Sequence, residues 1–77
     1  MIEVNAVEPV SNFGLILTFN NGERRCFDMR PYLRYTVFRK LENPGYFSLA
    51  RVDYGTVTWP GEIDIAPETL YEDSAPL

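Results

Sequence analysis

The fold is decided by residues 14–27, which read Gly14-Leu-Ile-Leu-Thr-Phe-Asn-Asn-Gly-Glu-Arg-Arg-Cys-Phe27. Extended residues flank the pair Asn21-Gly22, and both residues of the pair tolerate the positive φ of a type I′ turn. The pattern predicts a β-hairpin with a two-residue loop, which places Leu17 opposite Cys26. In that register the thiol lies on the buried face, together with Leu15 and Leu17.

Alternating apolar and polar residues predict further strands on both sides of this hairpin. Residues 2–6 alternate with a period of two before it. Residues 46–53 and 56–59 are expected to form a second hairpin around a tight turn at Tyr54-Gly55. A last short strand is predicted at residues 63–65.

An amphipathic helix of about three turns is predicted between the two hairpins. Leu33, Val37 and Leu41 recur at i, i+4 and i+8, and the helix could break near Tyr35-Thr36. The sequence Asn43-Pro44-Gly45 is expected to end it.

Two aspartates have the spacing of local caps. Asp28 can cap the start of the predicted helix. A second, C-terminal helical turn is expected to open at Ala66-Pro67-Glu68 and to run through Tyr71, with the proline near its start. Asp64 lies just before that turn, where we expect it to accept hydrogen bonds from backbone N–H groups.

The predicted fold class is α+β. We expect a small single domain of β-hairpins that form an antiparallel sheet, with one short helix packed on it and a short C-terminal helical turn. Residues 1–72 are assigned to this domain, and residues 73–77 to a frayed C-terminal tail. The strand order stays open, because the two hairpins could join at either edge.

The composition excludes several classes of function. The 77 residues include no His and a single Cys, Cys26. Ser-His and Cys-His nucleophile pairs are therefore excluded, as are an internal disulfide and a structural zinc site. The chain has no glycine-rich phosphate loop, nucleophile elbow or CxxC motif. We expect a protein that is not an enzyme and that uses no cofactor.

The beginning of the chain predicts a cytoplasmic location. It lacks the basic region and the apolar region that a secretory signal requires. The longest apolar run of the whole chain is far shorter than the ~20 residues of a membrane span. We expect no membrane association.

A core in a chain of this size supplies only about 3–5 kcal/mol without disulfides or metals. This shortage favours association with a protein partner or with a second copy.

Charge is segregated along the chain, although the net charge is only −4. Residues 24–51 hold all seven basic residues, and every charged residue in the segment 52–77 is acidic. Arginine binds carboxylate or phosphate, and tyrosines such as Tyr32 and Tyr35 can stack on bases. The competing interpretation is a solvated face of a strand and a helix. The candidate partner-binding residues are Arg24, Arg25, Arg30, Arg34, Arg39 and Lys40.

The acidic residues Asp53, Glu62, Asp64 and Glu68 could converge on a divalent cation. No calcium-loop pattern is present, so solvated carboxylates are the favoured interpretation. Trp59 could be an exposed binding residue, but a single Trp in a strand of a small domain is more often the centre of the core.

Residues 57–71, Val57-Thr-Trp-Pro-Gly-Glu-Ile-Asp-Ile-Ala-Pro-Glu-Thr-Leu-Tyr71, resemble the C-terminal signature of a bacterial family, domain of unknown function 2442. The resemblance extends over nearly the whole chain, including the Phe-x-Asx-Gly hairpin at Phe19 to Gly22 and the following Phe27-Asp28. The matching positions are interpreted as structural. They are Trp59, Pro60, Gly61, Asp64, Pro67, Leu70 and Tyr71.

The resemblance implies a small α+β domain with no established activity. Family members are often encoded beside another short protein, an arrangement that resembles a two-gene toxin–antitoxin pair in which this member is the non-catalytic partner. Some larger relatives fuse the domain to a helix-turn-helix, which these 77 residues do not contain. The resemblance therefore carries over neither DNA binding nor catalytic residues.

Three hypotheses follow. The leading one is a non-enzymatic protein-interaction module that binds the product of an adjacent gene or a second copy of itself. The alternative is a nucleic-acid-binding regulator that uses the basic segment 24–51, which the negative net charge disfavours. The third is a small hydrolase or metal enzyme built on the four acidic residues.

Overall fold

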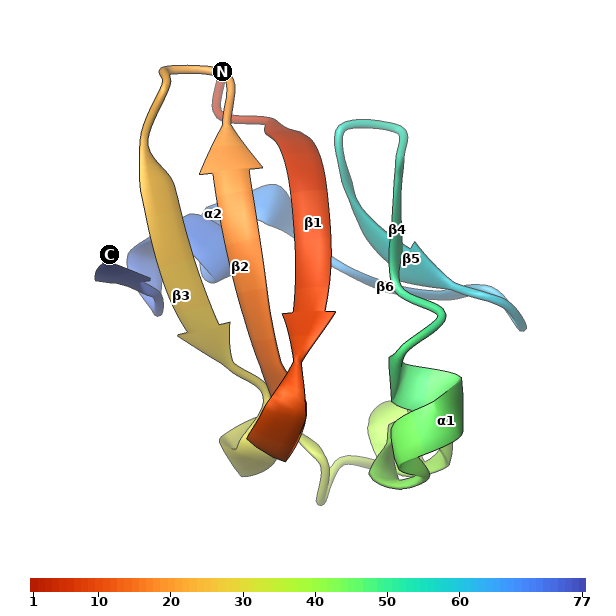
Figure 1. Ribbon diagram of the computed structural model, residues 1–77. Coiled ribbons are helices and arrows are strands. Elements are labelled where there is room, and N and C mark those ends of the chain that lie inside the picture. Colours follow the sequence, from red (N-terminus) through yellow and green to blue (C-terminus); the bar gives the residue numbers. More distant parts are fainter.

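Two antiparallel sheets, joined by short helices, make up the computed structural model, which describes residues 1–77 (Figure 1). Sheet A has the order β1-β2-β3-β7, with β1 (Val4–Val10), β2 (Gly14–Phe19), β3 (Arg24–Asp28) and β7 (Ala75–Pro76). Sheet B has the order β4-β5-β6, with β4 (Arg51–Asp53), β5 (Thr56–Trp59) and β6 (Ile63–Ile65). The α+β class is confirmed, and the hairpins form two sheets where one was expected.

The helical elements are all short. Three are 3₁₀ helices, η1 (Ser11–Phe13), η2 (Arg30–Tyr32) and η3 (Thr36–Glu42). Two are α-helices, α1 (Pro44–Phe47) and α2 (Pro67–Glu72), the second being the predicted C-terminal helical turn. No helix is long and apolar enough to cross a bilayer.

The β2–β3 hairpin forms in a register one residue away from the predicted one. Ile16, not Leu17, lies opposite Cys26. The loop has three residues, Asn20-Asn21-Gly22, and ends with Gly22 at a φ of 88°. Three-residue loops that end in a left-handed glycine are a common alternative to the two-residue turn. Because a shift of one residue turns every side chain to the other face, Cys26 is half-buried on the face opposite the core residues of β2.

The neighbouring asparagine explains the longer loop. The side chain of Asn20 accepts a hydrogen bond from the backbone N–H of Glu3 at 3.1 Å and donates one to the Met1 carbonyl at 2.9 Å. The Asn21 side chain accepts from the Glu23 N–H at 3.0 Å. Both asparagines are therefore used within the loop, and the strands close at Phe19 and Glu23, where an N–H···O bond of 2.9 Å joins them.

The second hairpin has the predicted turn but a shorter first strand. Val52 lies opposite Val57 across the two-residue turn Tyr54-Gly55, and both turn residues have positive φ. The strand expected over residues 46–53 begins only at Arg51, because residues 44–47 are helical. The Asn43 side chain caps this helix by accepting a hydrogen bond from the Gly45 N–H at 2.8 Å, a signal that competes with strand formation.

The amphipathic α-helix predicted around Leu33, Val37 and Leu41 is replaced by η2 and η3, which are separated by an extended Tyr35. A 3₁₀ helix has three residues per turn, so its inward face repeats at i and i+3. Phe38 and Leu41 therefore point inward, whereas Val37 is 68% exposed. The predicted break near Tyr35-Thr36 is correct; the predicted α-helical phase is not.

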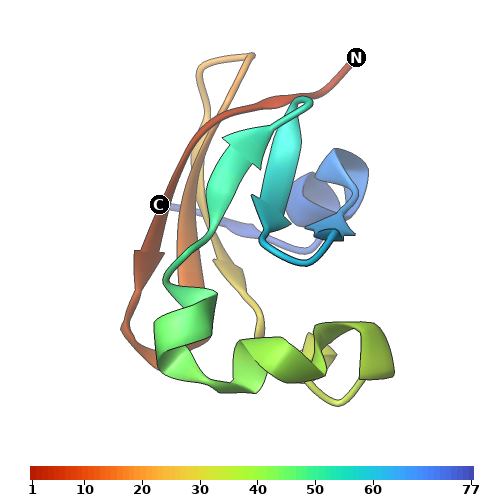
Figure 2. The same cartoon turned by 90° about the vertical axis from the view of Figure 1, so that its right-hand side faces the viewer.

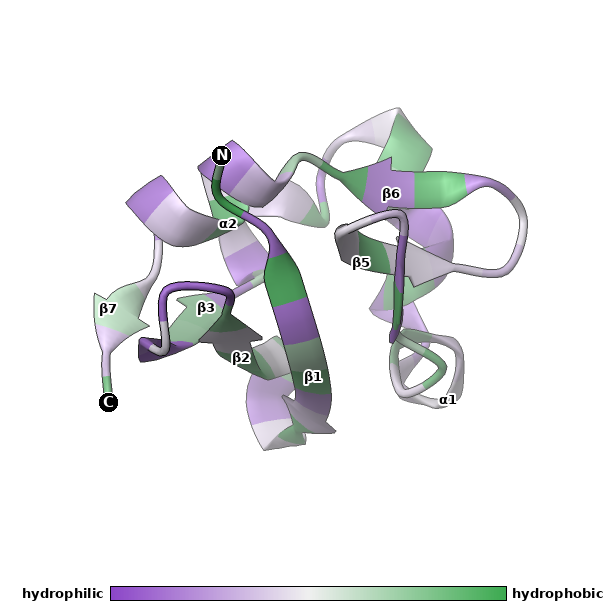
Figure 3. Cartoon of the chain, turned by 90° about the horizontal axis from the view of Figure 1, so that it is seen from above, coloured by the Kyte–Doolittle hydropathy of each residue, from purple (hydrophilic) through white to green (hydrophobic).

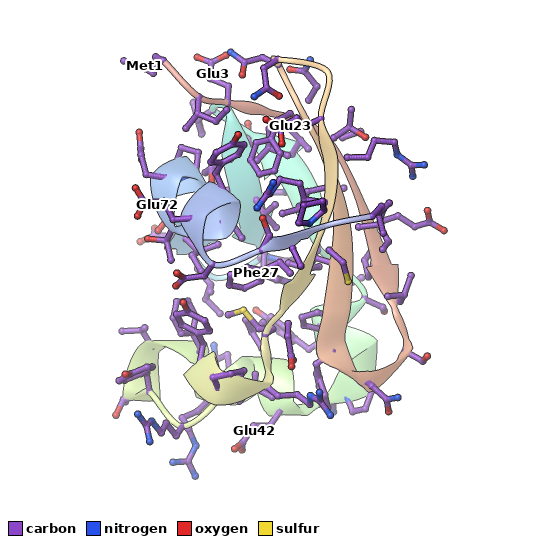
Figure 4. All side chains as sticks on the ribbon, turned by 90° about the vertical axis from the view of Figure 1, so that its left-hand side faces the viewer. Met1, Glu3, Glu23, Phe27, Glu42 and Glu72 are labelled. Atoms are coloured by element: carbon purple, nitrogen blue, oxygen red, sulfur yellow. The ribbon has the colours of Figure 1, made fainter.

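The core lies between the two sheets and α2. Trp59 is 1% exposed, and its indole Nε1–H donates to the Phe47 carbonyl at 2.9 Å. Figures 1 and 2 show α2 and sheet B on one face of sheet A, while no element covers the other face. Figure 3 shows the two sheets from above, and Figure 4 places Phe27, fully buried, on the covered side.

The C-terminal tail does not follow the expectation that residues 73–77 are frayed. Ala75–Pro76 pair with β3, and the Leu77 N–H donates to the Arg24 carbonyl at 3.2 Å. Ser74 is only 9% exposed. The tail is ordered because Arg25, which points inward in the observed register, hydrogen bonds to Ser74.

We predict that Trp59→Phe lowers the free energy of unfolding by about 2 kcal/mol, because it removes core volume and the hydrogen bond to Phe47. Urea unfolding followed by far-ultraviolet circular dichroism measures the change without using the Trp signal. Val37→Ala, at an exposed position, is the control and should change stability by less than about 0.5 kcal/mol. Equal stability of Trp59→Phe and the wild type would contradict this account of the core.

Candidate functional site

The six candidate partner-binding residues lie on separate parts of the molecule. Arg24 is exposed on the uncovered face of sheet A, opposite Thr18 of β2. Arg25 points to the other face of the same strand, because side chains alternate along a strand, and its side chain is 14% exposed. The remaining four come from η2, η3 and the residues between them. They lie at the end of the molecule opposite the β2–β3 loop, where Figure 4 labels Glu42.

Arg25 is a structural residue, which corrects its assignment to a partner-binding surface. Its Nε donates to the Ser74 hydroxyl and its Nη2 to the Ser74 carbonyl, both at 2.7 Å. Its Nη1 forms an ion pair of 3.0 Å with Glu23, and the guanidinium lies over the Tyr71 ring, 4.7 Å from its centroid. The contacts with Ser74 and Tyr71 hold the C-terminal segment on β3, so Arg25 is not available to a partner.

Glu23 belongs to the same network. The hydroxyl of Tyr71 donates to its carboxylate, and this bond lowers the pKa of Glu23, with Arg25 and Asn21 contributing in the same direction. The same bond raises the pKa of Tyr71. The network is therefore in its bonded form when Glu23 is ionised and Tyr71 is neutral.

Two further candidates are paired with carboxylates. Arg30 binds Asp28 through Nε at 3.0 Å and Nη2 at 2.9 Å, and this lowers the pKa of Asp28. The Asp28 carboxylate also accepts from the Arg30 backbone N–H at 2.9 Å. It is not the predicted helix cap, because Met29 occupies the N-cap position of η2 and no side chain caps it. Arg39 lies 3.5 Å from Glu42. Both pairs are well exposed, so neither contributes much to stability.

The strongest concentration of exposed basic and apolar side chains is residues 34–40, which we call the basic lobe. Arg34 lies over the ring of Tyr35, 5.4 Å from its centroid, and has no carboxylate partner. Tyr35 is 49% exposed and Val37 is 68% exposed. Lys40 is exposed and has no ion pair.

An open cavity of about 450 Å³ adjoins the basic lobe. Arg34 and Tyr35 line it together with Tyr32, Asp28 and Asp73. The Tyr32 hydroxyl donates to the Asp73 carboxylate, and this hydrogen bond is the main reason that the pKa of Tyr32 is raised to about 12. The bond also ties η2 to the C-terminal segment.

Several of the residues that carry the family resemblance make contacts within the fold. Trp59 and Leu70 are buried, Pro67 is at the first turn of α2, and the Pro60 carbonyl accepts from the Tyr46 hydroxyl. Gly61 has a φ of +88°, and a Cβ there would lie 2.9 Å from the same hydroxyl, so the turn requires glycine.

Asp64 departs from its predicted role. It is exposed on β6, opposite Thr58, and caps no helix; α2 begins after Ala66 without a side-chain cap. Asp64 alternates along β6 with Ile63 and Ile65, which are buried, so its side chain points to solvent. Of the four acidic residues, Asp53, Glu62 and Asp64 line one open cavity beside Arg51, whereas Glu68 does not. No group of three or more His, Cys, Asp or Glu side chains is arranged to hold a metal ion.

Sequence reasoning missed the exposure of Val37, which it placed on the buried face of a helix. The signal that could have shown it is the predicted break near Tyr35-Thr36, since a break changes the phase of the following turn. Arg34, Arg39 and Lys40 are exposed in the structure.

The chain resembles a family of proteins of unknown function, DUF2442, whose model matches residues 4–76. The chain belongs to the DUF2442 family. This confirms the resemblance drawn from residues 57–71. No curated protein matches the chain.

The fold also resembles a solved structure, that of a "Putative DNA Binding Protein" from Nitrosomonas europaea. The two share 21% sequence identity with a TM-score of 0.84 over 96% of this chain. The match covers 49% of the other protein, so this family member spans about half its length. At this identity the likeness shows the fold alone.

We predict that Tyr32→Phe reduces the loss of stability at alkaline pH. Because the pKa of Tyr32 is raised from 10.0 to about 12 in the folded protein, the bond to Asp73 contributes fully below pH 10 and is lost as the pH rises toward 12. The urea midpoint of the wild type should therefore fall more steeply across this range than that of the variant. Tyr54→Phe, at a tyrosine that is 95% exposed, should keep the wild-type profile. Identical profiles for Tyr32→Phe and the wild type would contradict the assignment.

Proposed function

We propose that the protein is a non-enzymatic protein-interaction module of the bacterial cytoplasm, whose basic lobe binds an acidic segment of a partner protein. The observation that carries the proposal is the exposure of Val37 and Tyr35 among basic side chains. Protein interfaces are enriched in Tyr and Arg, and their binding energy is concentrated in a few such residues.

The basic lobe is ordered before any partner arrives. Phe38 and Leu41 anchor it in the core, and successive i+3 hydrogen bonds hold η3. A surface that is rigid in its free state loses less entropy when it binds. This supports a binding role for Val37 and Tyr35, because no folding requirement accounts for their exposure.

The charge of the lobe supports an acidic partner. Arg34 and Lys40 have no carboxylate partner. Arg39 pairs with Glu42 at the surface, and it can leave Glu42 for a carboxylate of a partner at little cost in free energy. Opposite charge on a partner would speed association and select against basic proteins. The resemblance to proteins encoded beside a second short protein supports the adjacent gene's product as this partner, in a toxin–antitoxin-like pair.

Nucleic-acid binding is the second candidate. It is supported by the printed description of the Nitrosomonas europaea protein, although the matched region is about half of that protein. The candidate basic residues of this chain lie on separate surfaces, and three of them are paired with carboxylates. Since DNA binding depends on several simultaneous phosphate contacts, this arrangement favours a protein partner.

The proposal predicts that the double variant Arg34→Glu/Val37→Glu weakens binding to the adjacent gene's product at least about tenfold, a change of about 1.4 kcal/mol. Isothermal titration calorimetry of the two purified proteins measures it. Arg51→Glu is the matched control, because it reverses an exposed basic charge outside the lobe, and it should bind as the wild type does. If Arg51→Glu weakened binding equally, the effect would come from the overall charge of the protein and not from the basic lobe. Unchanged binding by the double variant would refute the basic lobe as the binding surface.

Fluorescence anisotropy with a labelled DNA duplex tests the second candidate. We expect no binding at low salt. Binding whose affinity falls steeply with salt, by a slope of about 0.9 per neutralised phosphate, would instead support the nucleic-acid-binding regulator.

A further inference from the structure

The uncovered face of sheet A has an unusual composition for a solvent-facing sheet. The side chains on this face alternate along β2 and β3 with the buried Leu15, Leu17 and Phe27. Its apolar members are Ala6, Val10, Ile16, Cys26 and Ala75, contributed by all four strands. Antiparallel sheets with one face in water usually place polar residues there.

Nothing within the chain covers this face. Figure 1 shows it toward the viewer, and Figure 2 shows it edge-on, with α2 and sheet B on the opposite side. Ile16 and Cys26 are half-buried by their own neighbours, whereas Ala6 and Ala75 are exposed and Val10 is 38% exposed. The face is therefore an uncovered surface that carries both apolar and charged side chains and is accessible to a partner.

The charges on this face favour a second copy of the chain as the partner. Glu8 lies on β1 opposite Ile16, and Arg24 lies on β3 opposite Thr18, so β2 separates them. From strand spacing and rise their Cα atoms stand about 12 Å apart, and no ion pair joins the two side chains. Neither has an ion pair elsewhere in the chain. The third charged group on the face, Asp28, is already bound by Arg30.

An unpaired acid and an unpaired base on one face are self-complementary under twofold symmetry. A twofold axis that lies in the interface and passes between them brings Glu8 of one copy against Arg24 of the other, and the reverse pair forms at the same time. Such isologous contacts are the commonest way in which identical chains associate. The apolar residues between the two charges would then be buried against each other.

We propose that the uncovered face of sheet A is the contact surface of a homodimer. The proposal is independent of the basic lobe, because the lobe residues come from η3 and the residues before it, and none belongs to this face. Four strands present roughly 400 Å², about half the ~800 Å² per partner of a standard interface. The dimer is therefore a reversible one, populated at high protein concentration.

Sedimentation velocity over protein concentrations from about 10 μM to about 1 mM tests the proposal, with charge reversals as the variants. Glu8→Arg and Arg24→Glu each place like charges together, so each should weaken dimerisation about tenfold or more. The double variant Glu8→Arg/Arg24→Glu restores opposite charges and should return to within about threefold of the wild type. Arg51→Glu, outside the face, should dimerise as the wild type does.

Cys26 gives a second measurement that does not depend on the charges. It is one strand away from the midpoint between Glu8 and Arg24, so the two thiols of a dimer come within reach of a short bis-maleimide cross-linker. The covalent dimer should form with the wild type and disappear with Glu8→Arg. A wild type that stays monomeric at the highest concentration would overturn the proposal. So would a dimer that is insensitive to both single reversals, because it would use another face.

Discussion

The register of the β2–β3 hairpin is the constraint on which the rest of the structure depends. Its three-residue loop, closed by Gly22, turns Arg25 toward the interior and Cys26 toward the uncovered face. A register shift of one residue would reverse both. With Arg25 inward, a half-buried guanidinium needs acceptors, and Ser74 and Glu23 provide them. The C-terminal strand is ordered as a consequence, so a loop of three residues determines the position of a segment some fifty residues away.

The same constraint explains why the segregated charge of the sequence does not become one basic surface. Arg25 is used inside the fold, Arg24 stands apart on the sheet, and Arg30 and Arg39 are paired with nearby acids. What remains of the basic segment is a small lobe with exposed apolar side chains. A lobe of that kind suits a shaped protein surface with a few carboxylates better than a long row of phosphates, which needs many cations in a line.

Local patterns predicted those parts of the fold in which one signal acts alone. The turn at Tyr54-Gly55, the strand at residues 63–65 and the burial of Trp59 all follow the sequence. The errors arise where two signals compete. Asn20 is satisfied by Glu3 and Met1, contacts distant in sequence that lengthen the loop. Val37 fits an α-helical repeat but lies in a 3₁₀ turn, whose phase depends on how Phe38 and Leu41 pack in the core.

The two proposed surfaces differ in chemistry, and their separation has a consequence for binding. The uncovered face of sheet A balances its charges within itself, so it favours an identical copy, whereas the basic lobe has a surplus of positive charge, so it favours an acidic partner and repels another lobe. A dimer formed through the sheet leaves both lobes free, because they lie at the end of the sheet and not on its face. Two lobes held at a fixed separation would bind a partner with two acidic segments more tightly than one lobe alone, since the second contact becomes intramolecular. Weak self-association would thereby control the strength of partner binding through protein concentration.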